Sequence, residues 1–169
     1  MRRQAGFTLI ELIAVMVILG LISVFAGIFI TTGVKGSIAA RQAQENAQRA
    51  QIALQRISLE LRDVQRGHTA GSAPVVTATS IKYGTSEPSL GGARTLAYDA
   101  VNKRLTLTPT NPGTAQILAD GVETCTMGFT GAAATSDIVF TVTFTLTGTS
   151  APFSITVKPR NIILNPVTS

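Results

Sequence analysis

The chain begins with a long, almost uninterrupted run of apolar positions. From Phe7 to Ile30, 24 residues contain one charged residue, Glu11. A helix of this length extends about 36 Å, which exceeds the thickness of about 30 Å of a membrane's hydrocarbon core. Arg2 and Arg3 precede the run, and basic residues on a short N-terminal side hold that side in the cytoplasm. We therefore predict one membrane-spanning helix, with the rest of the chain beyond the membrane.

A second pattern, from Lys35 to Arg66, predicts that this helix continues with one apolar stripe. Its residues are mainly Ala, Gln, Arg and Leu, which are strong helix formers, and Gly67 is predicted to end the helix. We expect the stripe to pack on this protein's own sheet; a coiled coil with another chain is the alternative. The stripe consists of Ala43, Ala47, Ala50, Leu54, Ile57, Leu61 and Val64, and the charged residues Arg41, Glu45, Arg49, Arg56, Glu60, Arg62 and Arg66 are predicted to lie mostly off it.

The third pattern, after Gly71, has the period of two that is typical of strands. Thr becomes frequent there, with 20 of the 23 threonines at Thr69 or later. Residues 138–147 alternate apolar side chains with Thr and are predicted to form a hairpin with residues 153–157. We predict an α+β fold, in which one antiparallel sheet of about five to seven strands covers the C-terminal half of the helix. The other predicted strands are 94–98 and 104–108, which form a hairpin, 75–83, and 116–122 leading into 126–130.

Composition excludes several classes of protein. The chain has 169 residues, of which 45% are hydrophobic and 14% charged, so it is not wholly disordered. One Cys excludes a disulfide framework and a Cys-rich zinc module, and one His excludes a multi-His metal site. No Gly-rich loop lies between a predicted strand and a helix, so there is no nucleotide-binding fingerprint.

Glu11 is unusual because a carboxylate inside a bilayer costs several kcal/mol unless it is paired. The sequence has no Lys or Arg between Arg3 and Lys35 to pair with it. A cut just before Phe7 would create an α-amino group, and this group on a neighbouring copy could pair with Glu11 and fix the register of the two chains. A secretory signal peptide cut near residues 24–26 and a plain membrane anchor are alternatives, but neither explains Glu11.

The segment Gly6-Phe7-Thr8-Leu9-Ile10-Glu11-Leu12, after a short basic leader, resembles the class III signal of type IV pilins and type II secretion pseudopilins. The resemblance implies cleavage between Gly6 and Phe7 by a membrane prepilin peptidase and N-methylation of Phe7. It also implies that Glu11 draws each incoming subunit onto the Phe7 amine of a neighbour. The chain then divides into a leader (1–6), a transmembrane and filament-core helix (7–34), an amphipathic helix (35–67) and an antiparallel β head (71–169).

More detailed resemblances narrow the choice among the members of this family. Residues 53–64 look like the helix of J-type pseudopilins and W-type minor pilins, and residues 117–122 and 157–161 are similar to strand motifs of that group. Major pilins usually have a C-terminal disulfide, which one Cys cannot form, and many have a helix-breaking Pro where this chain has Ile28. These features favour a minor pilin or a pseudopilin over a major pilin.

The resemblance implies a structural subunit without catalytic activity or cofactor. It would be inserted in the inner membrane with its head in the periplasm, and assembled with other pilin or pseudopilin subunits by an inner-membrane platform. An envelope-anchored binding module, for DNA uptake, adhesion or recognition of a secreted protein, is the alternative. A secreted enzyme or lectin behind an ordinary signal peptide is a third hypothesis.

The predicted β head has few candidate residues for catalysis or metal binding. His68 has no second His and lies at the predicted helix end, and Cys125 is predicted to be a small core residue in a strand. Asp99 with Asn102, or Asp120 with Glu123, are candidates for calcium, but neither pair has the dense acidic spacing of a calcium loop. We assign all four to turns and the surface.

The basic residues raise the question whether this protein binds nucleic acid. The net charge is +5, and five Arg lie between Arg41 and Arg66, but Trp is absent and there are two Tyr. Proteins that bind single strands stack bases on exposed aromatic side chains. Nucleic acid is thus a possible but unsupported partner, and phospholipid head groups are an alternative.

Overall fold

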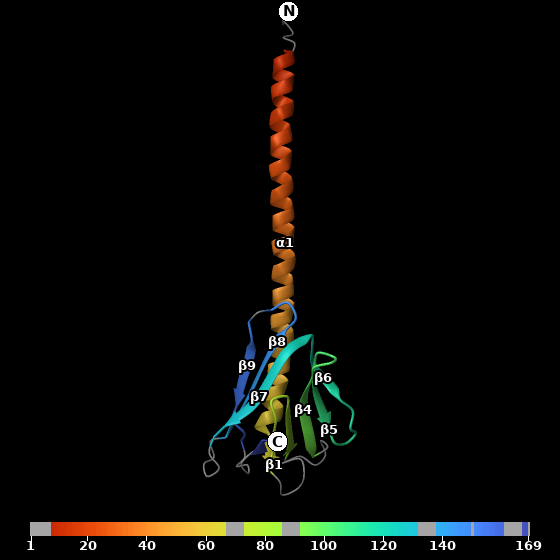
Figure 1. The fold of residues 1–169 in the computed structure, drawn as a ribbon, viewed down its shortest axis with the longest axis vertical. Coiled ribbons are helices and arrows are strands. Elements are labelled where there is room, and N and C mark those ends of the chain that lie inside the picture. Colours follow the sequence, from red (N-terminus) through yellow and green to blue (C-terminus); the bar gives the residue numbers. More distant parts are fainter. Residues whose placement is uncertain are drawn as a thin grey trace, which may run out of the picture. The chain divides into compact units, whose positions relative to one another are not determined.

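The computed structural model describes residues 8–66, 73–85, 92–131, 138–149, 151–160 and 167–168 (Figure 1). Their contacts divide the chain into two units, Met1–Gln44 and Glu45–Ser169, which we describe separately. One helix, α1, spans Leu9–Arg62. The strands are β1 (Val64–Arg66), β2 (Val75–Val76), β3 (Ser80–Thr85), β4 (Ala93–Asp99), β5 (Arg104–Pro109), β6 (Gln116–Asp120), β7 (Val122–Thr130), β8 (Val139–Leu146), β9 (Phe153–Val157) and β10 (Val167–Thr168).

The first unit is the N-terminal part of α1, which is helical without a break through Ile28. Two of its hydroxyl groups are bonded within the helix. Ser23 Oγ donates to the Leu19 carbonyl at 2.7 Å, and Thr31 Oγ1 donates to the Gly27 carbonyl at 3.0 Å. Polar groups satisfied in this way tolerate apolar surroundings, which supply no hydrogen-bond partners of their own.

The C-terminal part of α1 belongs to the second unit and contributes one face to its core. Ala50, Ile57 and Leu61 are fully buried, and Leu54 packs partly against the core. The predicted packing of the stripe on the protein's own sheet is therefore confirmed from Ala50 onward, whereas Ala43 and Ala47 are exposed.

The predicted helix end at Gly67 is wrong by about one turn. α1 ends at Arg62, and β1 pairs antiparallel with β3, with Val64 opposite Thr85. Val64 is fully buried, so pairing and burial of this β-branched residue outweigh the helix propensity of its neighbours. The amide of Arg160 donates to the carbonyl of Arg62 at 2.9 Å and satisfies one acceptor at the helix end. Gly67 itself lies outside the described residues.

The larger sheet has seven strands in the order β10-β2-β3-β4-β5-β6, with β1 also beside β3. Its pairs are antiparallel except that β10 and β2 are parallel. The predicted hairpin of residues 94–98 and 104–108 is confirmed as β4 and β5. The single strand predicted for 75–83 is wrong, because a turn separates β2 from β3. In this turn, Thr77 Oγ1 accepts from the amide of Ser80 at 2.8 Å.

A second sheet has three strands in the order β7-β8-β9 and contains the predicted hairpin of β8 and β9. The prediction of one sheet is therefore wrong. The chain leaves β6 through Gly121, which has φ of 71°, and β7 pairs with β8 instead of continuing the first sheet. Local alternation predicts strands but does not predict which strand pairs with which.

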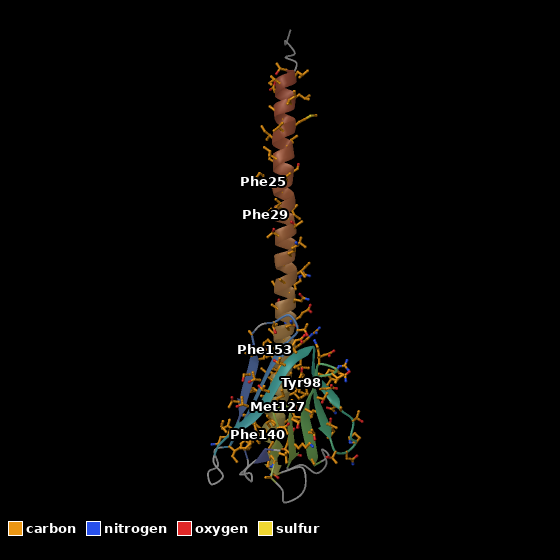
Figure 2. All side chains as sticks on the ribbon, in the orientation of Figure 1. Phe25, Phe29, Tyr98, Met127, Phe140 and Phe153 are labelled. Atoms are coloured by element: carbon orange, nitrogen blue, oxygen red, sulfur yellow. The ribbon has the colours of Figure 1, made fainter. Side chains whose placement is uncertain are left out.

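Both sheets and the end of α1 bury one core, so the α+β fold class is confirmed. Figure 2 shows Met127 and Phe140 within the head, and both are buried. The rings of Phe144 and Phe153 lie 5.9 Å apart in a tilted arrangement, which joins β8 to β9. The largest fully buried side chains are those of Tyr83, Phe140, Phe144, Ile57, Leu61, Ile81, Leu96, Leu105, Leu107, Leu146, Val64 and Val76.

We expect Gly121→Ala to lower the free energy of unfolding by about 1–2 kcal/mol, because an L-residue is strained at this positive φ. The added Cβ would make an ordinary contact of 3.5 Å with Thr147 Oγ1, so the backbone conformation alone is the expected cause. Gly128→Ala, in β7, is the control, because its Cβ would meet no atom within 4 Å. Urea unfolding of both variants tests this, and equal midpoints would contradict it.

Candidate functional site

Glu11 lies in the first turn of α1, where the helix dipole stabilises a negative charge. The carboxylate is exposed and borders a shallow groove of about 340 Å³ on one helix face. The rest of the groove is apolar, and its other residues are Leu12, Val15, Met16 and Leu19. The structure therefore presents the acid at the head of an apolar stripe. Gly6 and Phe7 lie outside the described residues, so the pairing of Glu11 with a Phe7 amine stays a prediction.

The apolar part of α1 exposes its side chains on all faces. Figure 2 shows Phe25 and Phe29 on this helix, and they are 70% and 82% exposed. Within the described residues, α1 is the one helix long and apolar enough to cross a membrane; its most apolar 18-residue window has a mean hydropathy of 2.9 and no buried residue. Water is an unfavourable solvent for so large an apolar surface, which calls for lipid or other apolar helices around it.

A buried ionic cluster in the head was not predicted from the sequence. Glu60, one of the charged residues predicted to lie mostly off the apolar stripe, is 6% exposed, so it is an exception to that prediction. One carboxylate oxygen, Oε1, contacts Arg56 Nη2 at 2.8 Å. The other, Oε2, accepts hydrogen bonds from Arg94 Nη1 and from the Tyr83 hydroxyl, the latter at 3.3 Å. Residues 53, 57 and 60 share one face of α1, and this spacing was the available signal.

This cluster joins α1 to β3 and β4 inside the core. Arg94 is 8% exposed, so its charge and that of Glu60 compensate each other away from water. Burial, and then the charge of Glu60, raise the pKa of Tyr83 well above its ordinary value, so this hydroxyl stays a donor. These contacts hold α1 against β3 and β4 of the larger sheet.

Cys125 lies in β7 and is buried, so its assignment to the core is confirmed. Burial raises the pKa of its thiol from 9.0 to about 12. A thiol that stays protonated at neutral pH is a poor nucleophile. Cys125 is therefore a packing residue with little reactivity in the folded state.

We expect Cys125 to react with a thiol reagent at least about 100-fold more slowly in the folded protein than in urea. Because the folded-state pKa is raised, the protonated thiol stabilises the fold below pH 9, and this contribution declines as the pH rises toward about 12. Thr126→Cys, in which the new thiol is exposed on the same strand, should react rapidly when Cys125 is replaced by alanine. Equal rates for the two positions would contradict the prediction.

The calcium candidates are engaged in turns and surface ion pairs, as their assignment predicted. Asp99 Oδ1 accepts from the amides of Val101 and Asn102, both at 3.0 Å, and the side-chain bond from Asn102 is the main cause of the lowered pKa of Asp99. Asp120 contacts Arg104 at 3.2 Å, and Glu123 contacts Lys103 at 2.9 Å. The part of the chain that the structure describes contains no cluster of three His, Cys, Asp or Glu residues that could hold a metal. His68 lies outside that part.

Neither tyrosine is fully exposed. Tyr83 is fully buried, and the Tyr98 hydroxyl donates to the Glu123 carbonyl at 2.8 Å. Arg41, Arg49 and Arg62 are exposed on α1. No aromatic residue lies between Arg41 and Arg62, so the hypothesis of nucleic-acid binding gains no support.

Among the comparisons with known proteins, one match was found, and it covers the N-terminal region of the chain. Residues 1–27 match the family model described as the prokaryotic N-terminal methylation motif. No curated protein and no solved structure matches the chain. The match confirms the resemblance to type IV pilins, including the class III signal, whereas the J-type or W-type assignment of the head remains a prediction.

Proposed function

We propose that this type IV pilin-like chain is a minor pilin or pseudopilin, a structural subunit of a type IV pilus or a type II secretion pseudopilus. The observation that supports this most is a methylation signal continuous with an apolar helix whose side chains are exposed on every face. In this proposal the leader, residues 1–6, is removed between Gly6 and Phe7, and Phe7 is then N-methylated. Prepilin peptidase and its methyltransferase activity act on the chain as their substrate.

Assembly in this proposal depends on two properties of α1. In the inner membrane, lipid surrounds the apolar residues 9–34, while the head lies in the periplasm. When the subunit leaves the membrane, its apolar surface stays favourable only if equally apolar helices of neighbouring subunits replace the lipid. The filament is therefore a bundle of such helices, built by an inner-membrane assembly platform.

Glu11 supplies register in this bundle. It is the only charge between residues 8 and 34, so a charged partner is favoured at one depth only. A Phe7 amine on a neighbouring subunit satisfies that condition after cleavage. Opposite charges attract strongly in a low-dielectric surrounding, and a mismatched pair would leave both charges desolvated.

Mass spectrometry of the N-terminus tests this function. We expect protein extracted from membranes to begin with N-methylated Phe7 and to lack the first six residues. Gly6→Leu should retain the leader, because a bulky residue at the cut hinders the peptidase, whereas Gly27→Ala is a control that should be processed normally. A chain that keeps Met1, or that begins near Gly27 as after an ordinary signal peptide, would refute the proposal.

A further inference from the structure

A pocket of about 240 Å³ in the head is lined by α1 and by residues of β4, β5 and β6, which are neighbours in the larger sheet (Figure 1). Arg94 of β4 and Leu107 of β5 are its buried lining residues. Arg56 of α1 also lines it, and its side chain is 48% exposed. The exposed lining residues are Asn111, Pro112 and Gln116. The pocket is therefore open to solvent and has a guanidinium group at its buried end.

The backbone of the sheet holds this pocket in shape. Arg94, near the start of β4, lies opposite Pro109 at the end of β5. In the turn after β5, the amide and the Oγ1 of Thr110 both donate to the carbonyl of Ala93 at 2.9 Å. These bonds fix the turn that contains Asn111 beside the start of β4. Side chains from four separate elements thus converge on one small space.

The two arginines of the pocket share one carboxylate. Glu60 contacts Arg56 through Oε1 and Arg94 through Oε2, so among the described residues this cluster has two positive charges and one negative. No Asp or Glu is among the described residues that line the pocket. A guanidinium group has five N–H donors, and the contact with Glu60 uses Nη2 of Arg56. The other donors of Arg56 can therefore bind a second carboxylate.

We propose that this pocket binds a small free carboxylate anion with a short apolar group. The carboxylate lies against the guanidinium groups of Arg56 and Arg94, where charge-assisted hydrogen bonds are strong. The side-chain amides of Asn111 and Gln116 donate to it from the open side. The apolar group contacts Leu107. The site belongs to the head and goes beyond the proposed assembly role of residues 7–34.

The charge and the size of the pocket both restrict its occupant. One carboxylate makes the cluster with Glu60 neutral, whereas a phosphate dianion adds one negative charge too many and is repelled by Glu60. Pockets that hold drug-sized ligands have volumes of about 300–1,000 Å³, and this pocket is smaller. A free acid of a few carbon atoms therefore fits it better than a phosphate or an acidic segment of a protein.

Titration of propionate into the full, ¹⁵N-labelled chain in uncharged detergent micelles tests this proposal. We expect saturable shifts in the side-chain amide signals of Asn111 and Gln116. Propionamide, which has the same shape without the charge, should bind at least about tenfold more weakly. Shifts that do not saturate, or equal shifts with propionamide, would overturn the proposal. Tighter binding of inorganic phosphate, or of a blocked tripeptide with a central glutamate, would overturn it as well.

Two variants test the pocket without disturbing its buried arginine. Arg56→Gln removes the partly exposed cation, and Gln116→Glu places a competing acid at an exposed position; each should weaken propionate binding about tenfold or more. Arg49→Gln is the matched control, because it removes the same charge from an exposed position of α1 outside the pocket. Circular dichroism should show the parent fold for all three. Unchanged binding by Gln116→Glu or Arg56→Gln, or equal weakening by Arg49→Gln, would refute the proposal.

Discussion

Glu11→Ala is expected to be cleaved and methylated normally but to enter filaments about 100-fold less than the parent protein. In the proposed assembly, cleavage depends on residues around Gly6, whereas incorporation depends on a partner for the Phe7 amine. Removing one member of a buried ion pair costs about 3–5 kcal/mol, because the other charge stays desolvated. An energy of about 3 kcal/mol corresponds to a factor of more than about 100 in binding. Quantifying the subunit in sheared filaments and in membranes measures the effect.

Two further variants separate charge from helix packing. Glu11→Gln keeps the size of the side chain and should fail like Glu11→Ala, because the neutral amide does not compensate an ammonium group. Glu45→Ala removes an exposed acid from the same helix and should assemble normally. Incorporation of Glu11→Ala at the parent level would show that the acid does not set register.

Glu60→Ala is expected to lower the free energy of unfolding of the head by about 3–5 kcal/mol. The substitution removes the carboxylate that contacts Arg94 and Tyr83, both of which are buried. It also leaves a small cavity between α1 and β3. Urea unfolding of the full chain, followed by circular dichroism of the strands, measures the change as a lower midpoint.

A double variant distinguishes the ion pair from simple loss of packing. Glu60→Leu with Arg94→Met replaces both charges by apolar groups and should be less destabilising than the sum of the two single changes. Glu45→Ala, at an exposed site on the same helix, should change stability by less than about 0.5 kcal/mol. Additive effects of the two core substitutions would mean that the charges do not interact.

Local periodicity predicts most of the elements of this protein. The apolar run and the stripe beginning at Ala50 predict α1, and strict alternation predicts the hairpins β4–β5 and β8–β9. The N-terminal signal is equally local, since it depends on a few adjacent residues at the head of an apolar helix. These features follow from residues close together in the sequence, where hydrophobic period and backbone geometry decide the outcome.

The features that were not predicted depend on residues far apart in the sequence. The end of α1 at Arg62 follows from pairing of β1 with β3, which begins 14 residues after β1 ends. The division into two sheets follows from the choice of β8, instead of β6, as the partner of β7. The burial of Glu60 follows from Arg94, which is 34 residues away. No local pattern specifies these partners.

The single, buried Cys125 has a consequence for how the head folds. A domain held together by hydrophobic packing and a desolvated ion pair has no crosslink to oxidise, so thiol oxidants and isomerases are dispensable for its folding. Its native state is also indifferent to reducing agents. The head can therefore fold equally well under oxidising and under reducing conditions.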